Sequence, residues 1–275
     1  MLMNIVYCCD WGALSGLEAS IYSLLTYNKH MRIYVFHMNY TRESTGEIYE
    51  QIPQIAMNKL SKVVRYLDPT SKIVFLDAYP IYEKYFLHGV AENDGHSSPL
   101  APIRLAVDIA LPFIDHCLYL DADTIIQGDI SSMYFSYLEE IDKSKYCYAG
   151  YHIPLDGIEH ELVASVLLFD LRKCRELGFL ERARYNITHN HYMWYDQSAL
   201  QDTGDCVKLP ETYNFMKPYE ERLYEPIILH FADKLSPKVY DKGAEYFYRR
   251  YPHLEYIQQG LKKLDSFNMV YPTQN

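Results

Sequence analysis

Short apolar runs alternate with stretches of helical spacing along most of the chain. Aromatic and β-branched residues fill segments such as 4–10 and 32–38, a composition typical of buried strands. Between these two segments, Leu17, Ile21 and Leu24 recur at the three- and four-residue spacing of a helix. This alternation predicts an α/β sheet with helices on its faces.

The same pattern predicts the order of the remaining elements. The predicted strands cover residues 4–10, 32–38, 63–67, 73–76, 117–123, 163–170, 206–209 and 227–232. The predicted helices cover residues 17–27, 48–60, 102–111, 171–184, 192–203 and 243–264. The polar segment 88–100 predicts a long loop, which is either a lid or a surface loop without a function. We predict one α/β domain over residues 1–240 and a helical extension over residues 241–275.

Composition narrows the classes of function. The chain has 275 residues, is 49% hydrophobic and carries a formal net charge of −10, which is typical of a globular domain and disfavours a nucleic-acid partner. The first apolar run ends at Asp10, too soon for a signal peptide, and no stretch is apolar enough to cross a membrane. The six cysteines include no CxxC pair, and several lie in apolar runs. We therefore expect buried, reduced thiols and a cytoplasmic protein.

The strongest chemical signal is a pair of acids at the end of a buried strand. In Leu118-Tyr-Leu-Asp121-Ala-Asp123-Thr124, an apolar run delivers two carboxylates one residue apart. Ligands of open α/β sheets bind at the carboxyl ends of the strands. Two carboxylates there repel each other unless a cation lies beside them, and Mn²⁺ or Mg²⁺ bridged to phosphates would suit them. The alternative is that both acids only cap the following turn.

Further motifs follow in a characteristic order. They are Asn4-Ile-Val-Tyr-Cys-Cys-Asp10, Ile103-Arg104-Leu105, Leu111-Pro112, Gly128-Asp129, Asp196-Gln197-Ser198-Ala199-Leu200, Leu209-Pro210 with Tyr213-Asn214, and Ile227-Ile-Leu-His230-Phe231. Together with the acidic pair, and over roughly residues 4–240, this ordered set resembles the family 8 retaining glycosyltransferases. That family includes bacterial lipopolysaccharide galactosyl- and glucosyltransferases and glycogenin.

The resemblance implies a GT-A fold, a UDP-sugar donor and a divalent metal, Mn²⁺ or Mg²⁺. It makes Asp121, Asp123 and His230 the metal ligands and places Asp196 and Gln197 near the anomeric carbon of the donor. The residues that it implies for donor binding are Cys8, Cys9, Asp10, Trp11, Arg104, Asp121, Ala122, Lys234 and Lys238. The acceptor would be a glycan, a glycoprotein or a glycolipid.

Plainer roles stay open for several of these residues. His230 could be a core histidine, and Asp196 could simply start a helix. Arg104 could pair with Asp108 four residues later, a weak interaction of about 0.3–0.5 kcal/mol. Trp11 follows the strand end directly, so that its ring packs either on the uracil or over the sheet edge.

The chain also departs from the family pattern. Val163-Ala164-Ser165 replaces the usual Asn-Ala/Ser-Gly, and valine cannot hydrogen-bond a sugar hydroxyl. The diphosphate-binding lysine is ambiguous between Lys234 and Lys238. These departures leave a degenerate, UDP-binding subunit or chaperone of a partner transferase as the alternative function. A metal-dependent phosphoryl transferase is a further reading, although the sequence has no Gly-rich phosphate loop.

A retaining mechanism and a tail function complete the expectations. Gln197 is a neutral amide and a weak nucleophile, which favours front-face attack by the acceptor, with the leaving diphosphate taking its proton. In the tail, aromatic and basic residues interleave over residues 246–251. This pattern predicts either contact with an anionic membrane surface or a helix that closes the core.

Overall fold

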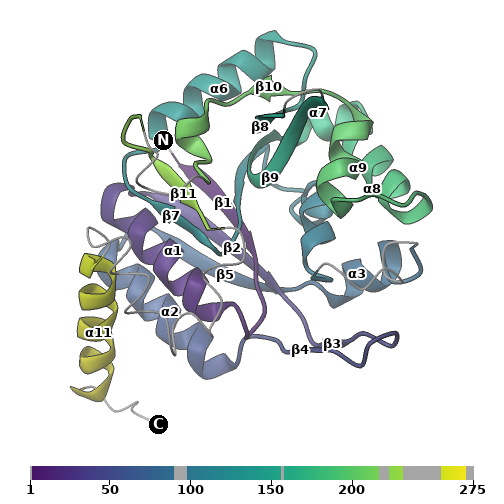
Figure 1. Cartoon of the computed structure of the whole chain (residues 1–275). Coiled ribbons are helices and arrows are strands. Elements are labelled where there is room, and N and C mark those ends of the chain that lie inside the picture. The colour runs from purple at the N-terminus through teal and green to yellow at the C-terminus, as the bar shows by residue number, and fades with distance from the viewer. Residues whose placement is uncertain (1, 90–97, 156–157, 217–222, 232–254, 271–275) are drawn as a thin grey trace.

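A seven-stranded mixed sheet runs through the middle of the molecule (Figure 1). The computed structural model describes residues 2–89, 98–155, 158–216, 223–231 and 255–270. The strand order is β10-β8-β9-β6-β1-β2-β5. The strands are β1 (Met3–Cys8), β2 (Met31–His37), β5 (Lys72–Asp77), β6 (His116–Leu120), β8 (Tyr148–Leu155), β9 (Ile158–Asp170) and β10 (Val207–Lys208). β6, β1, β2 and β5 run parallel, whereas β9 is antiparallel to both β6 and β8.

Two short antiparallel pairs and the helices complete the described fold. The pairs are β3 (Tyr40–Thr41) with β4 (Ile48–Tyr49), and β7 (Thr124–Ile126) with β11 (Ile228–His230). The α-helices are α1 (Leu14–Tyr27), α2 (Gln54–Leu67), α3 (Tyr79–Tyr85), α5 (Val107–Ala110), α6 (Ser131–Lys143), α7 (Leu171–Glu176), α8 (Phe179–His189), α9 (Tyr195–Thr203) and α11 (Glu255–Val270). Residues Ala101–Ala106 and Glu211–Tyr213 form the 3₁₀-helices η1 and η2.

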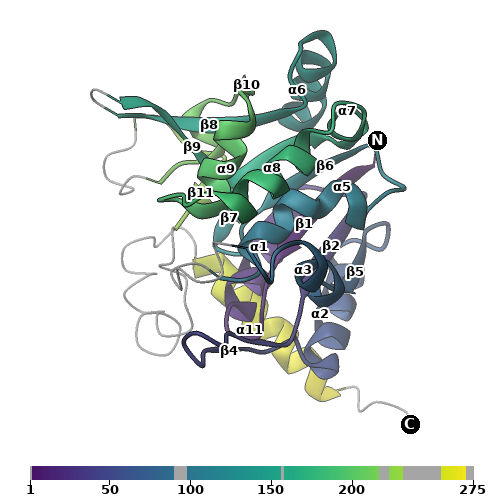
Figure 2. The ribbon, with the colours of Figure 1, turned by 90° about the vertical axis from the view of Figure 1, so that its right-hand side faces the viewer.

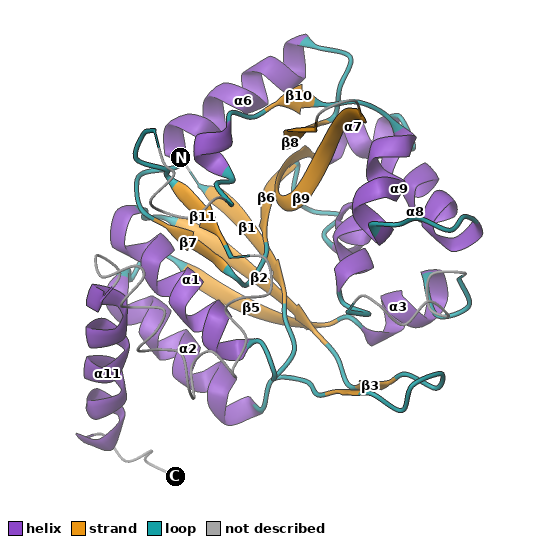
Figure 3. Cartoon of the chain, viewed as in Figure 1, coloured by secondary structure: helices purple, strands orange, loops and turns teal. Residues whose placement is uncertain are grey.

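Helices cover both faces of the sheet, as the sequence predicts. Successive side chains of a strand point to opposite faces, so Ile5 and Tyr7 of β1 pack in one core and Val6 packs in the other. Helices α1, α2 and α6 complete the first core, while α7, α8, α9 and η1 complete the second (Figure 3). The predicted α/β class is therefore confirmed.

The predicted helix 48–60 begins too early and ends too early, and the predicted strand 63–67 is wrong. Ile48–Tyr49 pairs with Tyr40–Thr41 as a hairpin, and helix α2 begins only after Pro53 and continues to Leu67. The β-branched Val63 and Val64 suggest a strand by composition. Their spacing from Ala56 and Leu60, however, places all four buried residues on one helical face. Helical periodicity therefore overrides the local preference for strand.

The structure contains elements that the sequence did not predict, and two predicted helices have a different form. Helix α6 and strand β8 have no counterpart among the predictions, and the outer ends of β8 and β9 extend past the other strands (Figure 2). Residues 102–111 form a 3₁₀ turn and a short helix instead of one α-helix. The segment 171–184 divides into α7 and α8 at Gly178, which has a φ of 59°. Residues 90–97 of the predicted loop lie outside the described residues.

The tail helix α11 packs along α1 (Figures 1 and 2). Ile257 is buried in a small core with Ala19 of α1, Phe215 and Leu229. Gly260 faces the ring of Tyr22, where a Cβ atom would lie about 2.1 Å from the ring. Glycine thus permits this close approach. Helix α11 closes part of the core, as one reading of the tail expects, while residues 232–254 lie outside the described residues and membrane contact stays a prediction.

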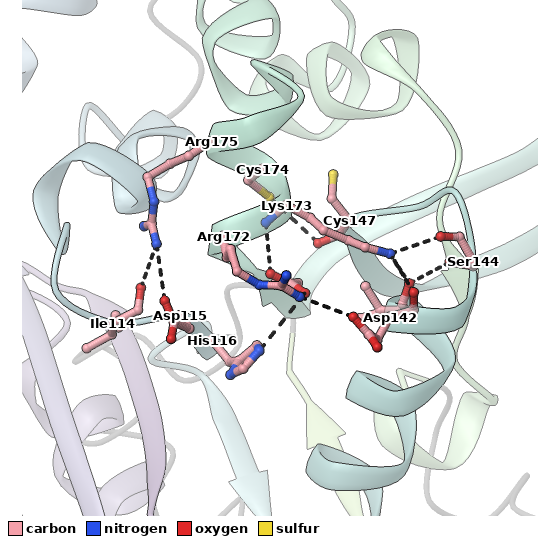
Figure 4. A network of polar contacts seen from close by, with 12 residues as sticks. Ile114, Asp115, His116, Asp142, Ser144, Cys147, Arg172, Lys173, Cys174 and Arg175 are labelled. Atoms are coloured by element: carbon pink, nitrogen blue, oxygen red, sulfur yellow. Dashed lines mark hydrogen bonds and ion pairs between the residues drawn. The ribbon is translucent and has the colours of Figure 1, made fainter.

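A polar network joins α6 to α7 at the end of the sheet where β6 begins (Figure 4). The Lys173 ammonium donates to the carbonyls of Ile141, Asp142 and Ser144, at 2.6, 3.0 and 2.9 Å, where α6 ends. The Asp170 carboxylate in turn accepts the backbone N–H of Lys173 and caps the start of α7. A cation at a helix C-terminus stabilises the carbonyls that no later turn can bind.

The cysteines and the helices bear on two further expectations. All six cysteines are unpaired, and every one except the half-buried Cys8 is buried, so that the predicted burial is confirmed and the reduced state stays a prediction. Among the described residues, no helix has both the length and the apolar composition that crossing a bilayer requires. The division into a domain of residues 1–240 and an extension stays a prediction.

Candidate functional site

The site lies where β1 and β6 end and β9 passes. Asp121 follows β6 directly, and its backbone N–H donates to the Ser165 carbonyl of β9 at 2.9 Å. Cys8 ends the neighbouring parallel strand β1. Segments far apart in the sequence therefore meet at one edge of the sheet, which is where an open α/β sheet binds ligands.

The guanidinium of Arg104 lies at the centre of this edge. It forms ion pairs of 3.0 Å with Asp121 and 2.9 Å with Asp196, and it lies over the ring of Tyr119 at 4.4 Å. It also donates to the Ala164 carbonyl of β9 at 2.6 Å. Burial alone would lower the pKa of Arg104, but the two carboxylates outweigh it and raise that pKa. Arg104 is therefore a fixed cation that holds two acids from different elements.

The alternative role of Arg104, an ion pair with Asp108, is not the one that the structure shows. Asp108 is buried and binds Arg184 of α8 at 2.6 Å. Residues 101–106 form a 3₁₀-helix of three residues per turn, so a residue and its fourth neighbour do not share a face there. The side chain of Arg104 is thus directed to the strand ends.

Asp196 occupies a buried position at the start of α9. Burial raises the pKa of this carboxyl, and Arg104 partly opposes the rise. Its Oδ2 atom lies 2.9 Å from Nε of Arg104, yet that N–H donates to the Ala101 carbonyl. The contact is therefore an attraction between charges without an aligned hydrogen bond. The preceding Tyr195 has a φ of 54°, a costly conformation for a bulky residue and one that is concentrated at functional sites.

Gln197 is tied to β9 by both ends of its amide. Its Oε1 atom accepts the N–H of Ala164 at 3.0 Å, and its Nε2 atom donates to Glu161 at 3.3 Å. The structure thus brings Gln197 and Asp196 to the same edge as Arg104. The roles expected for them near the donor sugar stay a prediction.

The three predicted metal ligands also come together. Suitable ligand atoms of Asp121, Asp123 and His230 all lie within 4.8 Å of one another. Strand β11 pairs with β7 and places His230 opposite Thr124, with its Nε2 atom 3.5 Å from Oδ1 of Asp123. Two carboxylates and an imidazole form a donor set that suits Mn²⁺. Tyr119 and Arg104 both contact Oδ1 of Asp121.

A second cluster of similar donors has a different character. His152, Asp205 and Cys206 also have ligand atoms within 4.8 Å of one another. Here, however, the ammonium of Lys208 lies 2.7 Å from Asp205 and 3.1 Å from Nε2 of His152. A cation of the chain itself therefore already compensates this group.

The segment after β1 holds the remaining described candidates. Oδ1 of Asp10 accepts the N–H of Ala13 at 2.9 Å, next to the first turn of α1, and burial raises the pKa of this carboxyl. The Trp11 side chain is 42% exposed, as a stacking platform requires. The backbone N–H of Cys9 donates to the Phe36 carbonyl, so that it is not available to bind the uracil base of a donor. The pKa of the Cys8 thiol is raised to about 12, mainly by burial. The charge of Arg104 and a hydrogen bond with Tyr119 lower this pKa, and the carboxylate of Asp121 raises it.

Other predicted residues are less informative. Ala122 is half-buried between the two acids. Val163 is buried in the core that α1, α2 and α6 complete, and its side chain offers no polar group where the resemblance implies an asparagine. Lys234 and Lys238 lie outside the described residues, so that the ambiguity between them stays open.

Tyr119 is a site residue that the sequence-based reasoning missed. Its hydroxyl donates to Oδ1 of Asp121 at 2.7 Å, and its ring lies under Arg104. The sequence could have indicated this contact, because residues two apart in a strand face the same side and Tyr119 lies two positions before Asp121. Ala164 was missed as well, since it acts through its backbone and not through a side chain.

A strand-end acidic pair beside a histidine, on this mixed sheet, forms a candidate metal-binding site of an α/β fold. A family model described as glycosyl transferase family 8 matches residues 4–149, more than half of the chain. The chain belongs to this family. A search of curated protein sequences gives no match.

Several solved structures share the fold of this chain. Glycosyltransferase GlyE of Streptococcus pneumoniae TIGR4 is 19% identical, with a TM-score of 0.64 over 100% of this chain and 66% of GlyE. Galactosyltransferase LgtC, in complex with donor and acceptor sugar analogues, is 17% identical, with a TM-score of 0.64 over 90% of this chain and 95% of LgtC. The bifunctional glycosyltransferase WbbM is 14% identical, with a TM-score of 0.64, and this chain spans 49% of it. The predicted GT-A fold is thereby confirmed.

Proposed function

We propose that this glycosyltransferase moves galactose or glucose from a UDP-sugar to a glycan, glycoprotein or glycolipid acceptor, with retention at the anomeric carbon. The observation that carries the proposal is the convergence of Asp121, Asp123 and His230 beside the Arg104–Asp196 pair. The likeness to LgtC, whose structure holds donor and acceptor sugar analogues, supports the same class of substrates.

We propose Mn²⁺ as the cofactor, with Mg²⁺ as the alternative, held by Asp121, Asp123 and His230. Tyr119 and Arg104 contact Oδ1 of Asp121, so that its Oδ2 atom would be the oxygen available to a metal. A bound divalent ion would neutralise the diphosphate leaving group. An imidazole ligand favours Mn²⁺ over the harder Mg²⁺.

The residues around the donor sugar act by position and charge. Gln197 is held by Ala164 and Glu161, and its neutral amide is a poor nucleophile. Asp196 is buried and bound to Arg104, which disfavours a covalent role for it. Attack by the acceptor from the face of the leaving group is the mechanism that these contacts support, with the departing diphosphate oxygen taking the proton.

A panel of UDP-sugars tests this proposal. We expect UDP release from UDP-galactose or UDP-glucose with Mn²⁺ and a glycan acceptor, and none with EDTA. Asp123→Asn should abolish release. The matched Asp129→Asn should retain it, because Asp129 accepts the N–H of Ser131 at the start of α6 and asparagine can do the same.

The assay also separates the competing functions. UDP binding without turnover on any donor would indicate the degenerate binding subunit, a reading that the buried Val163 favours. Absence of metal-dependent UDP binding would contradict both. The cytoplasmic location expected from the thiols stays part of the proposal.

A further inference from the structure

A chain of buried polar groups leads from β9 to His230. The Val163 carbonyl accepts a hydrogen bond from Nδ2 of Asn214 at 3.3 Å. Oδ1 of Asn214 accepts the hydroxyl proton of Ser165 at 2.8 Å. The Ser165 oxygen lies 3.0 Å from Nδ1 of His230. Asn214 is fully buried and Ser165 is 2% exposed, so that solvent does not compete for these groups.

The direction of each hydrogen bond follows from the first. A carbonyl can only accept, so the Val163 carbonyl fixes the amide nitrogen of Asn214 on its side and turns the amide oxygen toward Ser165. The amide oxygen is again only an acceptor, and the hydroxyl proton of Ser165 must point to it. The serine oxygen then has only lone pairs left for His230. Nδ1 of His230 must therefore carry a proton and donate it.

We propose that Ser165 is a positioning residue that holds the proton of neutral His230 on Nδ1 and so leaves the lone pair of Nε2 to bind the metal. The proposal rests on the proposed metal site. Without Ser165 the ring has the opposite preference, because Nε2 lies 3.5 Å from the Asp123 carboxylate, an acceptor for an Nε2–H. The hydrogen bond at one ring nitrogen decides which tautomer a ligating histidine adopts.

Ser165 gives this chain a device that a glycine cannot provide. The resemblance to the family places glycine at this position, and glycine has no group that could accept the Nδ1 proton. The same strand position also lends its backbone carbonyl to the N–H of Asp121. One residue of β9 thereby contacts two of the three proposed ligands, one through its backbone and one through its hydroxyl.

The first experiment reads the tautomer directly in the metal-free protein. Long-range ¹H–¹⁵N correlation spectra at about pH 8.5, where free imidazole is neutral, distinguish a protonated from a bare ring nitrogen. Comparison with His230→Gln assigns the signals. We expect a protonated Nδ1 in the wild type and a bare Nδ1 in Ser165→Ala. A bare Nδ1 in the wild type would overturn the proposal.

The second experiment measures Mn²⁺ affinity by electron paramagnetic resonance without any substrate. Loss of an outer hydrogen bond to a ligating histidine lowers metal affinity about 10- to 100-fold, and we expect this for Ser165→Ala. The control is Ser71→Ala, which removes another buried hydroxyl, one that accepts the N–H of Met31 at 2.8 Å far from the site. It should lower stability and leave Mn²⁺ affinity unchanged.

The outcomes distinguish this inference from the proposed function. A Ser165→Ala variant that binds Mn²⁺ as tightly as the wild type would overturn the role of Ser165. A wild-type protein that binds no Mn²⁺ would overturn the proposed metal site instead. The tautomer of the metal-free protein would then still show whether Ser165 sets the proton position.

Discussion

Arg104→Met tests whether one guanidinium compensates the buried acids of the site. At about 3 Å and an effective dielectric near 20, each of its two ion pairs amounts to about 5 kcal/mol of Coulomb attraction. Desolvation of the three groups offsets most of this attraction. Removal of one partner from a buried pair nevertheless costs about 3–5 kcal/mol, because the remaining charge stays buried. We expect the midpoint of thermal unfolding to fall by about 6–20 °C.

The pH dependence identifies the cause of this loss. Burial already raises the pKa of Asp196, and the loss of Arg104 should raise it further. A carboxyl with a raised folded-state pKa destabilises the folded protein at higher pH, and this penalty disappears as pH falls toward the ordinary Asp pKa of about 3.9. The difference in unfolding free energy between wild type and Arg104→Met should thus be largest near pH 7 and shrink toward pH 4.

Arg184→Met is the matched control. Arg184 has the same 8% side-chain exposure, binds the buried Asp108 at 2.6 Å and lies over the ring of Tyr85. Its removal should cost similar stability in urea unfolding but leave UDP and Mn²⁺ affinity unchanged, whereas Arg104→Met should weaken both. A loss below about 1 kcal/mol for Arg104→Met, or one that is the same at pH 4 and pH 7, would refute the charge argument.

Three further predictions concern other parts of the chain. Asp123→Asn should abolish Mn²⁺-dependent UDP binding in calorimetry and Asp129→Asn should not; equal wild-type affinity with Mn²⁺ and with EDTA would contradict the metal site. Trp11→Ala should weaken UDP binding by about 0.5–1.5 kcal/mol at unchanged stability if the exposed ring stacks on uracil, and unchanged affinity would exclude stacking. Lys173→Met should lower the free energy of unfolding in urea by about 2 kcal/mol, because the carbonyls at the end of α6 lose their donor. Arg172 is half-exposed, so Arg172→Met should lower it by less than about 1 kcal/mol, and equal losses would argue against the capping role.

The sequence predicts the elements best where apolar runs are long and uniform. Strands β1, β2 and β6 and helix α1 follow directly from such runs. It fails at residues 63–67, where two valines suggest a strand but their register with Ala56 and Leu60 continues α2. A longer helical window, opened by Pro53, would have indicated the helix.

The candidate site is predicted through motifs and not through geometry. The order of the motifs predicts that Asp121, Asp123 and His230 belong to one metal site, and the structure places their side chains close together. The partners of Arg104 could not be derived from local spacing. Its contact with Asp196 joins residues far apart in the chain, and the alternative partner Asp108 is taken by Arg184, 76 positions away.

The arrangement of charge at this sheet edge supports the proposal that a cation must bind before a diphosphate can approach. Arg104 is shared between Asp121 and Asp196, so that it compensates only part of their combined charge. Asp123 faces His230, and a histidine binds a metal as the neutral imidazole, so that as a ligand it would not offset the carboxylate charge. At about 4 Å, each contact between a carboxylate and a phosphate would cost about 4 kcal/mol at an effective dielectric near 20. The contacts that hold the acids in place therefore leave an excess of negative charge at the edge, and a divalent ion there would turn repulsion of the donor into attraction.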